Sequence, residues 1–418
     1  MTELHIAAQP FPSYQGTQAA IRCMLEARGA RAELFTYGAE GYPWRPSFPL
    51  HRGPDNARSA LRSGPSWTKV LADLRMSMML PDLCRQRGAR VLIAHHVEAM
   101  ALACRMRGLP RVFFAHTDLA AELPSYAAPR YAGILARAGA LTDRALCAQA
   151  HAVAAISPAL CDALQASSGI HATYVPTPWP VPAPIRPSER ISARHQLGLR
   201  EQAIVALYAG NLDAYQDAEQ TLAALERLAA AGGPRLFLLL ATNSAPERFL
   251  ARAVQLGVPF RTLPLGGETI RRMLHAAADL AIVPRATPGG LPMKLLDAMA
   301  RGLPCALAPL AAAGLRLRGR AEQADAPGPR ALSDAVARLL GRLRQSEPRR
   351  ELSDRARAYI ALEHSTTRFH AALDRVIADA RGNQRGALRS GANARQQQIE
   401  DTSTIDPHRS YFVRCVVT

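Results

Sequence analysis

The residues with the clearest potential for chemistry lie in one segment, 283–308, which reads VPRATPGGLPMKLLDAMARGLPCALA. We expect a strand to end at Arg285, a flexible turn to follow through Gly289 and Gly290, and a helix to open with Pro292 in its first turn. Glycines let a backbone approach a ligand closely, and the free N–H groups at a helix start attract anions. The segment therefore predicts an anion-binding site.

Two charged residues of the same helix strengthen this prediction. Lys294 lies one turn into the helix and adds a mobile positive charge, which suits a phosphate. Asp297 projects from the same face three residues later, where its carboxylate could accept a hydrogen bond from a ribose hydroxyl. An amphipathic helix with exposed Lys and Asp side chains would show the same spacing, so the spacing alone leaves both interpretations open.

A second group of candidates consists of histidines. His116 follows an apolar strand, so it is either a site residue or a buried core histidine. His95 and His96 precede Glu98, but no third ligand lies nearby in the sequence, so no metal site is predicted. The chain also has no Asp-x-Asp pair for a metal-bound diphosphate, no G-x-G-x-x-G after the first strand and no Walker lysine loop.

The elements that must position these residues alternate between strand and helix, which is typical of α/β proteins with covered parallel sheets. In the N-terminal half we expect strands near 4–8, 32–37, 91–95, 112–116, 152–156 and 173–175, with helices over 16–28 and 66–87. In the second half we expect strands at 203–209, 236–241, 260–265, 280–284 and 304–308, and helices at 218–231, 245–256, 268–277, 291–301, 331–344 and 347–380.

A proline-rich stretch divides the two halves. Residues 176–192 read PTPWPVPAPIRPSERIS, which disfavours helix and central strand and predicts a stiff linker. The 418 residues are enough for two cores. We predict two doubly wound Rossmann-like domains facing a central cleft, with residues 38–65 as a functional loop over it. The expected divisions are 1–178, a linker at 179–200, a second domain at 201–346, helices packing back at 347–381 and a disordered tail at 382–418.

Composition limits the partners. The formal net charge is +17, nearly all of it from dispersed arginines, since Lys69 and Lys294 are the only lysines. Aromatic residues make up 6% and do not interleave with the arginines, so nucleic-acid binding is not expected, whereas peripheral contact with an anionic membrane stays open. The seven cysteines lack C-x-x-C spacing and predict neither disulfides nor zinc. Without an apolar run of about 18 residues or a signal peptide, we expect a cytoplasmic protein, with peripheral attachment at the inner membrane face open.

The run from Gly290 to Pro304 closely resembles the donor-binding helix of GT-B fold glycosyltransferases of the family-4-like type. Four other segments are similar to that family in order and position: PFPSYQGTQAAI (10–21), FFAHTDLAAELP (113–124), AVAAISPALCDAL (152–164) and LYAGNLDAYQDAEQTLAAL (207–225). The resemblance covers about residues 4–380. It implies transfer of a sugar from a UDP- or GDP-linked donor to an unidentified acceptor, without a metal or other cofactor and with retention of configuration.

The resemblance also implies roles for individual residues. His116, Arg285 and Lys294 would be catalytic, with His116 near the reacting sugar and the two cations on the leaving phosphate. Residues implied to bind the donor are Gly16, Thr17, Asn211, Tyr215, Gly289, Gly290, Leu291, Pro292, Leu295 and Asp297.

Two departures from the family pattern affect these expectations. Members often have two glutamates at the positions of Gly289 and Asp297, and a Lys-Gly pair where this chain has Gln216 and Asp217. Neutralisation of the phosphate would then depend more on Arg285 and Lys294. The departures keep two alternatives open, a catalytically silent subunit that binds a nucleotide-sugar and a nucleotide-sugar 2-epimerase.

Overall fold

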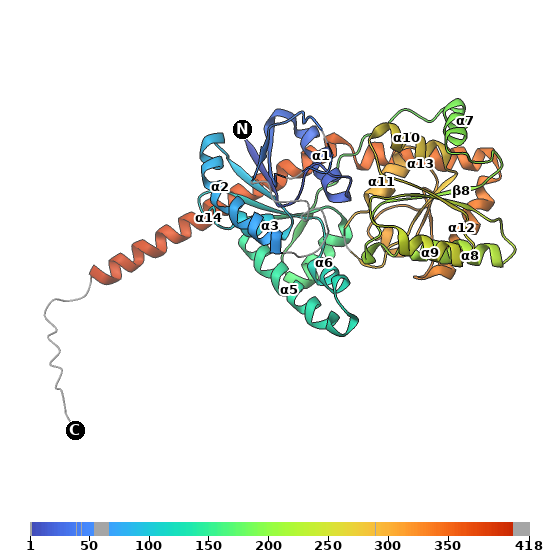
Figure 1. Ribbon diagram of the computed structural model, residues 1–418. Coiled ribbons are helices and arrows are strands. Elements are labelled where there is room, and N and C mark those ends of the chain that lie inside the picture. The colour runs from blue at the N-terminus through green and yellow to red at the C-terminus, as the bar shows by residue number, and fades with distance from the viewer. Residues whose placement is uncertain (1, 39, 43, 54–66, 289, 404–418) are drawn as a thin grey trace, which may run out of the picture.

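The structure is a computed structural model that describes residues 2–38, 40–42, 44–53, 67–288 and 290–403. Its N-terminal half is a parallel sheet of seven strands in the order β3-β2-β1-β4-β5-β6-β7 (Figure 1). The strands are β1 (Glu3–Ala7), β2 (Ala32–Thr36), β3 (Leu50–Arg52), β4 (Val91–His95), β5 (Arg111–Ala115), β6 (Ala152–Ala155) and β7 (Ala172–Tyr174). Nearly every residue of β1, β2, β4 and β5 is buried, as expected for parallel strands covered on both faces.

Helices connect these strands on both faces of the sheet. They are α1 (Gly16–Arg28), α2 (Trp67–Arg87), α3 (His96–Ala103), α4 (Leu119–Glu122), α5 (Ala132–Gln149) and α6 (Pro158–Ser168). Local sequence fixes several of their ends. The Ser157 hydroxyl accepts a hydrogen bond from the backbone N–H of Leu160 at the start of α6, and Gly169 ends that helix in the left-handed conformation.

The C-terminal half has a second parallel sheet, of six strands in the order β10-β9-β8-β11-β12-β13. These are β8 (Val205–Ala209), β9 (Phe237–Ala241), β10 (Phe260–Leu263), β11 (Leu280–Val283), β12 (Cys305–Leu307) and β13 (Glu322–Gln323). Around it lie α7 (Pro187–Gln196), α8 (Glu219–Ala230), α9 (Glu247–Gln255), α10 (Glu268–Ala277), α11 (Met293–Ala300), α12 (Pro329–Leu343) and α13 (Ser346–Glu363). The predicted fold class, two Rossmann-like domains, is confirmed.

The last helix ties the two halves together. Helix α14 (Thr366–Ser403) follows α13, leaves the second domain and packs against β5, β6 and β7 of the first (Figure 1). Its His370 bonds the carbonyl of Ala27, and Asp374 pairs with Arg28 at the end of α1. One continuous buried apolar cluster runs through both domains, so they pack as neighbours along a shared contact.

The structure corrects three sequence predictions. Residues 187–192 belong to helix α7, because Pro187 occupies its first turn, where a missing N–H costs nothing. The tail is helical as far as Ser403, since α14 continues through 382–403. Strands β3 and β13 were not predicted, because three- and two-residue edge strands leave no periodic pattern. Residues 54–65 of the predicted loop over the cleft lie outside the described residues, whereas 50–52 of that loop form β3, and the predicted domain divisions stay predictions.

Candidate active site

The turn between β11 and α11 brings the two domains into contact. Gly290 has φ +61°, and a Cβ atom there would lie 2.8 Å from Nη2 of Arg285 and 3.1 Å from the backbone oxygen of His116. Only glycine combines that conformation with so close an approach. Pro292 is the N-cap residue of α11, so the helix begins at Met293, two residues after the predicted start at 291, and Pro292 precedes the first turn. Gly289 lies outside the described residues.

Lys294 is held in the first turn of α11 by groups from the β8 loop. Its Nζ donates a hydrogen bond of 2.9 Å to Oε1 of Gln216 and lies 4.1 Å from the ring centroid of Tyr208. Gly210 makes room, because a Cβ there would meet Nζ at 3.0 Å. Within the described part of the chain, no carboxylate lies within 4.0 Å of this ammonium group. Desolvation and the nearby charge of Arg285 lower the pKa of Lys294 to about 7.

Arg285 is the second cation of this site. It follows β11, is 7% exposed, and donates from Nε to the carbonyl of Thr287 at 2.9 Å. Its guanidinium lies 5.9 Å from the ring centroid of Tyr215, whose backbone oxygen accepts the N–H of Ala286 at 3.1 Å. Burial lowers the pKa of Arg285. Two desolvated positive charges at one sheet edge make a site that an anion would stabilise strongly.

The loop after β8 completes this edge. Asn211 donates from Nδ2 to the Asp213 carboxylate at 2.6 Å and to the Tyr215 hydroxyl at 2.9 Å, and its own backbone oxygen accepts the Tyr208 hydroxyl at 2.6 Å. The Asn211 side-chain oxygen is buried and has no hydrogen-bond partner among the described residues. β8 and β11 are neighbours at the switch point of the strand order, where open α/β sheets bind ligands.

The first domain contributes the N-terminus of α1 and the end of β5. Gly16 begins α1 and faces Met293, since a Cβ on Gly16 would lie 3.4 Å from Cγ of Met293. Thr17 follows in the first turn of α1. α1 and α11 thus face each other across the domain contact. His116 is 3% exposed and lies next to Gly290 through its backbone oxygen.

His116 belongs to a buried histidine cluster that sequence reasoning recognised only in part. Its Nε2 lies 2.9 Å from Nδ1 of His95, and Nε2 of His95 lies 2.9 Å from Nδ1 of His5. The His96 ring lies 4.8 Å from that of His116, and His96 has φ +70°, a strained conformation for a residue other than glycine. The sequence did not indicate His5, because it meets His95 only through the order of the strands in the sheet. Within the described ranges, no His, Cys, Asp or Glu group has an arrangement that could hold a metal.

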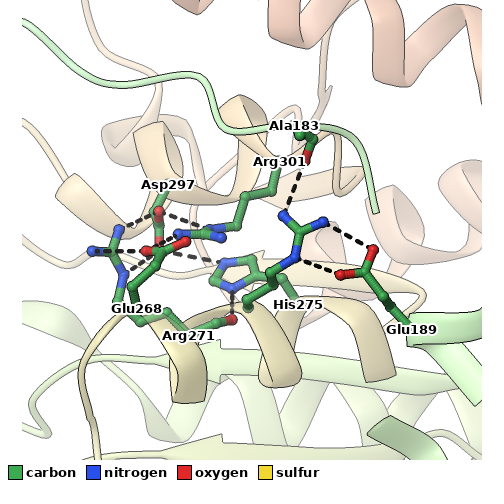
Figure 2. Close-up of polar contacts among 8 residues, drawn as sticks. Ala183, Glu189, Glu268, Arg271, His275, Asp297 and Arg301 are labelled. Carbon is green, nitrogen blue, oxygen red and sulfur yellow. Dashed lines mark hydrogen bonds and ion pairs between the residues drawn. The ribbon is translucent and has the colours of Figure 1, made fainter. Parts of the chain in front are cut away.

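Asp297 is engaged away from this group. Figure 2 shows its carboxylate between Arg271, Arg301 and His275. Arg271 makes a bidentate contact, Arg301 Nε lies 3.1 Å from Oδ1, and His275 Nε2 lies 3.6 Å from Oδ2. Burial opposes ionisation, but these neighbours hold the pKa of Asp297 well below its usual value. The sequence did not indicate these partners. Arg271 and His275 lie on another helix, α10, and Arg301 lies one turn after Asp297 at the end of α11.

The structure thus gathers most of the predicted site residues and leaves others in the core. The group gathered at the edge formed by β8 and β11 comprises Asn211, Tyr215, Arg285, Gly290 and Lys294. Leu291 and Pro292 are buried in the turn, and Leu295 is fully buried and packs in the apolar cluster. Tyr208, Gly210 and Gln216 contact Lys294 and were not predicted, although Gly210 directly follows β8 and Gln216 lies in the loop after it.

Two parallel-sheet domains of this kind that meet at a turn between them are the GT-B architecture. Comparison with known families agrees: the profile described as Glycosyltransferase Family 4 matches residues 20–178, and that of Glycosyl transferases group 1 matches residues 189–359. The chain belongs to the family-4-like, group 1 glycosyltransferases and is a glycosyltransferase. No curated protein matches it in sequence.

Solved structures share the fold at low sequence identity. HepE from Anabaena in complex with UDP-glucose has a TM-score of 0.72 at 15% identity, covering 90% of this chain and 100% of that one. Sucrose-phosphate synthase from Thermosynechococcus elongatus has a TM-score of 0.72 at 16% identity, covering 96% and 100%. WaaG, a glycosyltransferase of lipopolysaccharide biosynthesis, has a TM-score of 0.67 at 17% identity, covering 90% and 99%. These similarities establish the GT-B fold.

Replacing Asp297 with asparagine should destabilise the protein by about 3–5 kcal/mol, because it leaves the buried Arg301 and the partly buried Arg271 without a full counter-charge. Urea unfolding followed by circular dichroism measures the loss. Glu268 is the matched control: it contacts the same two arginines, but its side chain is 59% exposed, so Glu268→Gln should cost less than about 1 kcal/mol. Equal losses in the two variants would contradict a structural role for the Asp297 cluster.

Proposed function

We propose that the enzyme transfers a glycosyl group from a UDP-linked sugar, and that Lys294 and Arg285 hold the diphosphate. The observation that supports this most strongly is the state of Lys294: its ammonium is desolvated, lies near a second cation and contacts a neutral amide and an aromatic ring. A diphosphate would supply the missing negative charge. Asn211, with its unpartnered side-chain oxygen, and Tyr215 would lie beside the nucleotide.

The proposed mechanism rests on charge that grows on the leaving diphosphate as the bond to the anomeric carbon breaks. That charge would be stabilised by Arg285, Lys294 and the backbone N–H groups around Gly290 and Leu291. Because these groups are already in place before the reaction, they need no reorganisation, and such preorganised charge is usually the largest source of rate enhancement. Because these groups supply the positive charge, we propose transfer that EDTA does not inhibit. Retention of configuration is implied by the family, and the anomeric coupling constant of the product in proton NMR tests it.

Support for uridine as the base comes from the solved structures. HepE was crystallised with UDP, with UDP-glucose, and with UDP and glucose, whereas the starch synthase IV domain from Arabidopsis thaliana holds ADP. A panel of UDP, GDP and ADP therefore identifies the base. Gly16, Thr17 and His116 lie on the opposing side, where the sugar and the acceptor would meet.

The first test measures nucleotide binding. Lys294→Met should weaken UDP binding about 10- to 100-fold in calorimetry, because a charged hydrogen bond to phosphate is lost. The matched control is Lys69→Met, which removes the only other lysine, located on α2, and should leave the affinity unchanged. UDP-glucose hydrolysis by the wild type then separates an active transferase from a silent subunit. A folded wild-type protein that binds none of the three nucleotides would refute the proposal.

The pKa of Lys294 leads to a second prediction. With a pKa of about 7, Lys294 is mostly neutral at about pH 8 in the free protein. A bound diphosphate favours the charged ammonium and raises this pKa, so binding should take up close to one proton at pH 8, and the affinity for UDP should fall as pH rises above 7. Calorimetry in two buffers of different ionisation enthalpy measures the uptake. The uptake should vanish in Lys294→Met, and buffer-independent heats in the wild type would contradict the assignment.

We also propose a membrane-facing surface on the first domain. Among the described residues, no helix is long and apolar enough to cross a bilayer. Helix α2, however, has a second apolar face that is exposed, formed by Trp67, Val70, Leu71, Leu74 and Met78. Helix α3 packs against both α2 and α5. Helix α5 exposes Ile134 and Leu141 on the same face as Arg137 and Arg144. Apolar residues interleaved with arginines suit an anionic membrane surface and favour an acceptor presented there.

Vesicle sedimentation tests this surface. Leu71→Glu together with Leu74→Glu should reduce binding to vesicles containing anionic phospholipid by at least about tenfold. The reason is that two negative charges replace exposed apolar side chains that would insert into the membrane interface. Val254→Glu is the control, since Val254 is 69% exposed on α9 of the other domain and should tolerate the same change. If the wild-type protein does not bind anionic vesicles at low salt, the proposed membrane surface is refuted. That result would not bear on the proposed donor site.

A further inference from the structure

Three neighbouring strands of the first sheet place three histidines in a row. His5 lies in β1, His95 ends β4 and His116 follows β5, and these strands are adjacent in the sheet order. Their side chains form a chain of contacts, from Nδ1 of His5 to Nε2 of His95 and from Nδ1 of His95 to Nε2 of His116, each 2.9 Å long. All three residues are at most 3% exposed. The row runs from the core of the sheet to His116, whose backbone oxygen lies against Gly290.

The row can hold its protons in only two ways. Burial lowers the pKa of all three histidines, so each is a neutral imidazole with one N–H at neutral pH. Each contact between two rings needs one N–H and one lone pair. Either all three rings are protonated on Nε2, or all three are protonated on Nδ1. The first arrangement leaves Nδ1 of His116 as a lone pair, and the second makes the same atom a donor.

A charge at the inner end of the row distinguishes the two arrangements. Nε2 of His5 lies 3.9 Å from Oε2 of Glu3, an electrostatic contact longer than a hydrogen bond. Burial opposes ionisation of Glu3, but its contacts with His5 and Arg28 lower its pKa to about 2, so it is a carboxylate at neutral pH. Arg28 bonds Glu3 with two nitrogens and also reaches Asp374 on α14 at 2.7 Å. A carboxylate attracts an N–H and repels a lone pair, so it favours protonation of His5 on Nε2.

We propose that Glu3, His5 and His95 are positioning residues that keep His116 protonated on Nε2, so that its Nδ1 accepts a hydrogen bond from a hydroxyl of the donor sugar. This inference rests on the proposed function for the identity of the ligand. Nδ1 of His116 is buried and has no partner among the described residues, while the backbone oxygen of the same residue lies against Gly290 of the donor turn. A buried acceptor without a partner is costly, and a sugar hydroxyl would satisfy it.

The tautomers can be measured in the free wild-type protein. In 15N-histidine-labelled protein, the nitrogen chemical shifts distinguish protonated from unprotonated ring nitrogens, and the loss of signals in His116→Gln assigns His116. We expect His5, His95 and His116 all to carry the proton on Nε2. A His116 ring protonated on Nδ1, or a charged His116 at neutral pH, would overturn the proposal before any ligand is added.

A pair of carboxylate variants tests the cause. Glu3→Gln keeps the shape of the side chain and can still bond Arg28, but an amide accepts or donates equally well, so His116 should lose its single tautomer. Glu33→Gln is the matched control: Glu33 is a buried carboxylate on β2 that pairs with His51 and Arg87 and does not contact the row. An unchanged His116 in Glu3→Gln, or the same change in both variants, would show that Glu3 does not set the proton positions.

Titration with UDP-glucose and with UDP tests the ligand. UDP-glucose should shift the Nδ1 resonance of His116 toward the protonated range, whereas UDP, which lacks the sugar, should not. Glu3→Gln should lower the affinity for UDP-glucose about fivefold and leave that for UDP unchanged. Equal shifts with both ligands, or none while calorimetry shows UDP-glucose binding, would overturn the hydroxyl assignment. If neither ligand binds, the proposed function fails, and the tautomer measurements still decide the role of Glu3.

Discussion

The architecture of this protein depends on two positive charges held at the edge of one sheet. Lys294 and Arg285 flank a single turn, at the start of α11 and just after the end of β11, and the strand order places the loop after β8 beside them. Desolvation of the two cations is unfavourable on its own. Attraction to a bound anion would offset that cost, so the arrangement favours anionic ligands. The glycines at 210 and 290 serve this constraint, because a Cβ at either position would collide with one of the two cations.

The domain contact follows from the same constraint. The first domain meets this sheet edge directly, because the turn at Gly290 touches the backbone of His116. Helix α14 keeps the first domain in place, since Asp374 bonds Arg28, and Arg28 in turn holds Glu3 beneath the histidine row. Packing of a C-terminal helix is therefore connected by five successive polar contacts, from Asp374 through Arg28, Glu3, His5 and His95, to His116 beside the turn at Gly290.

Much of this arrangement could be predicted from the sequence, because short apolar strands and capped helices have strong local signals. The helices at 16–28 and 268–277 begin and end where the sequence indicates. The histidine row could not be predicted, since His5, His95 and His116 meet only through strand order, which no local pattern encodes. The partners of Asp297 were missed for a related reason. Arg271 lies on another helix, and in a chain with many dispersed arginines nothing marks it as the one that turns inward.

The departures from the family pattern are consistent with one another in the structure. Gln216 stands where relatives often have lysine, and its amide oxygen accepts a hydrogen bond from Lys294, so positive charge comes from α11 instead. Asp217 stands where they often have glycine and still has φ +49°, a conformation that aspartate tolerates better than most residues. At 297 the shorter acid is bound by Arg271 and Arg301, which makes it a support for the contact between α10 and α11. In the proposed function, binding of the diphosphate therefore depends on fewer side chains, which makes Lys294 harder to replace.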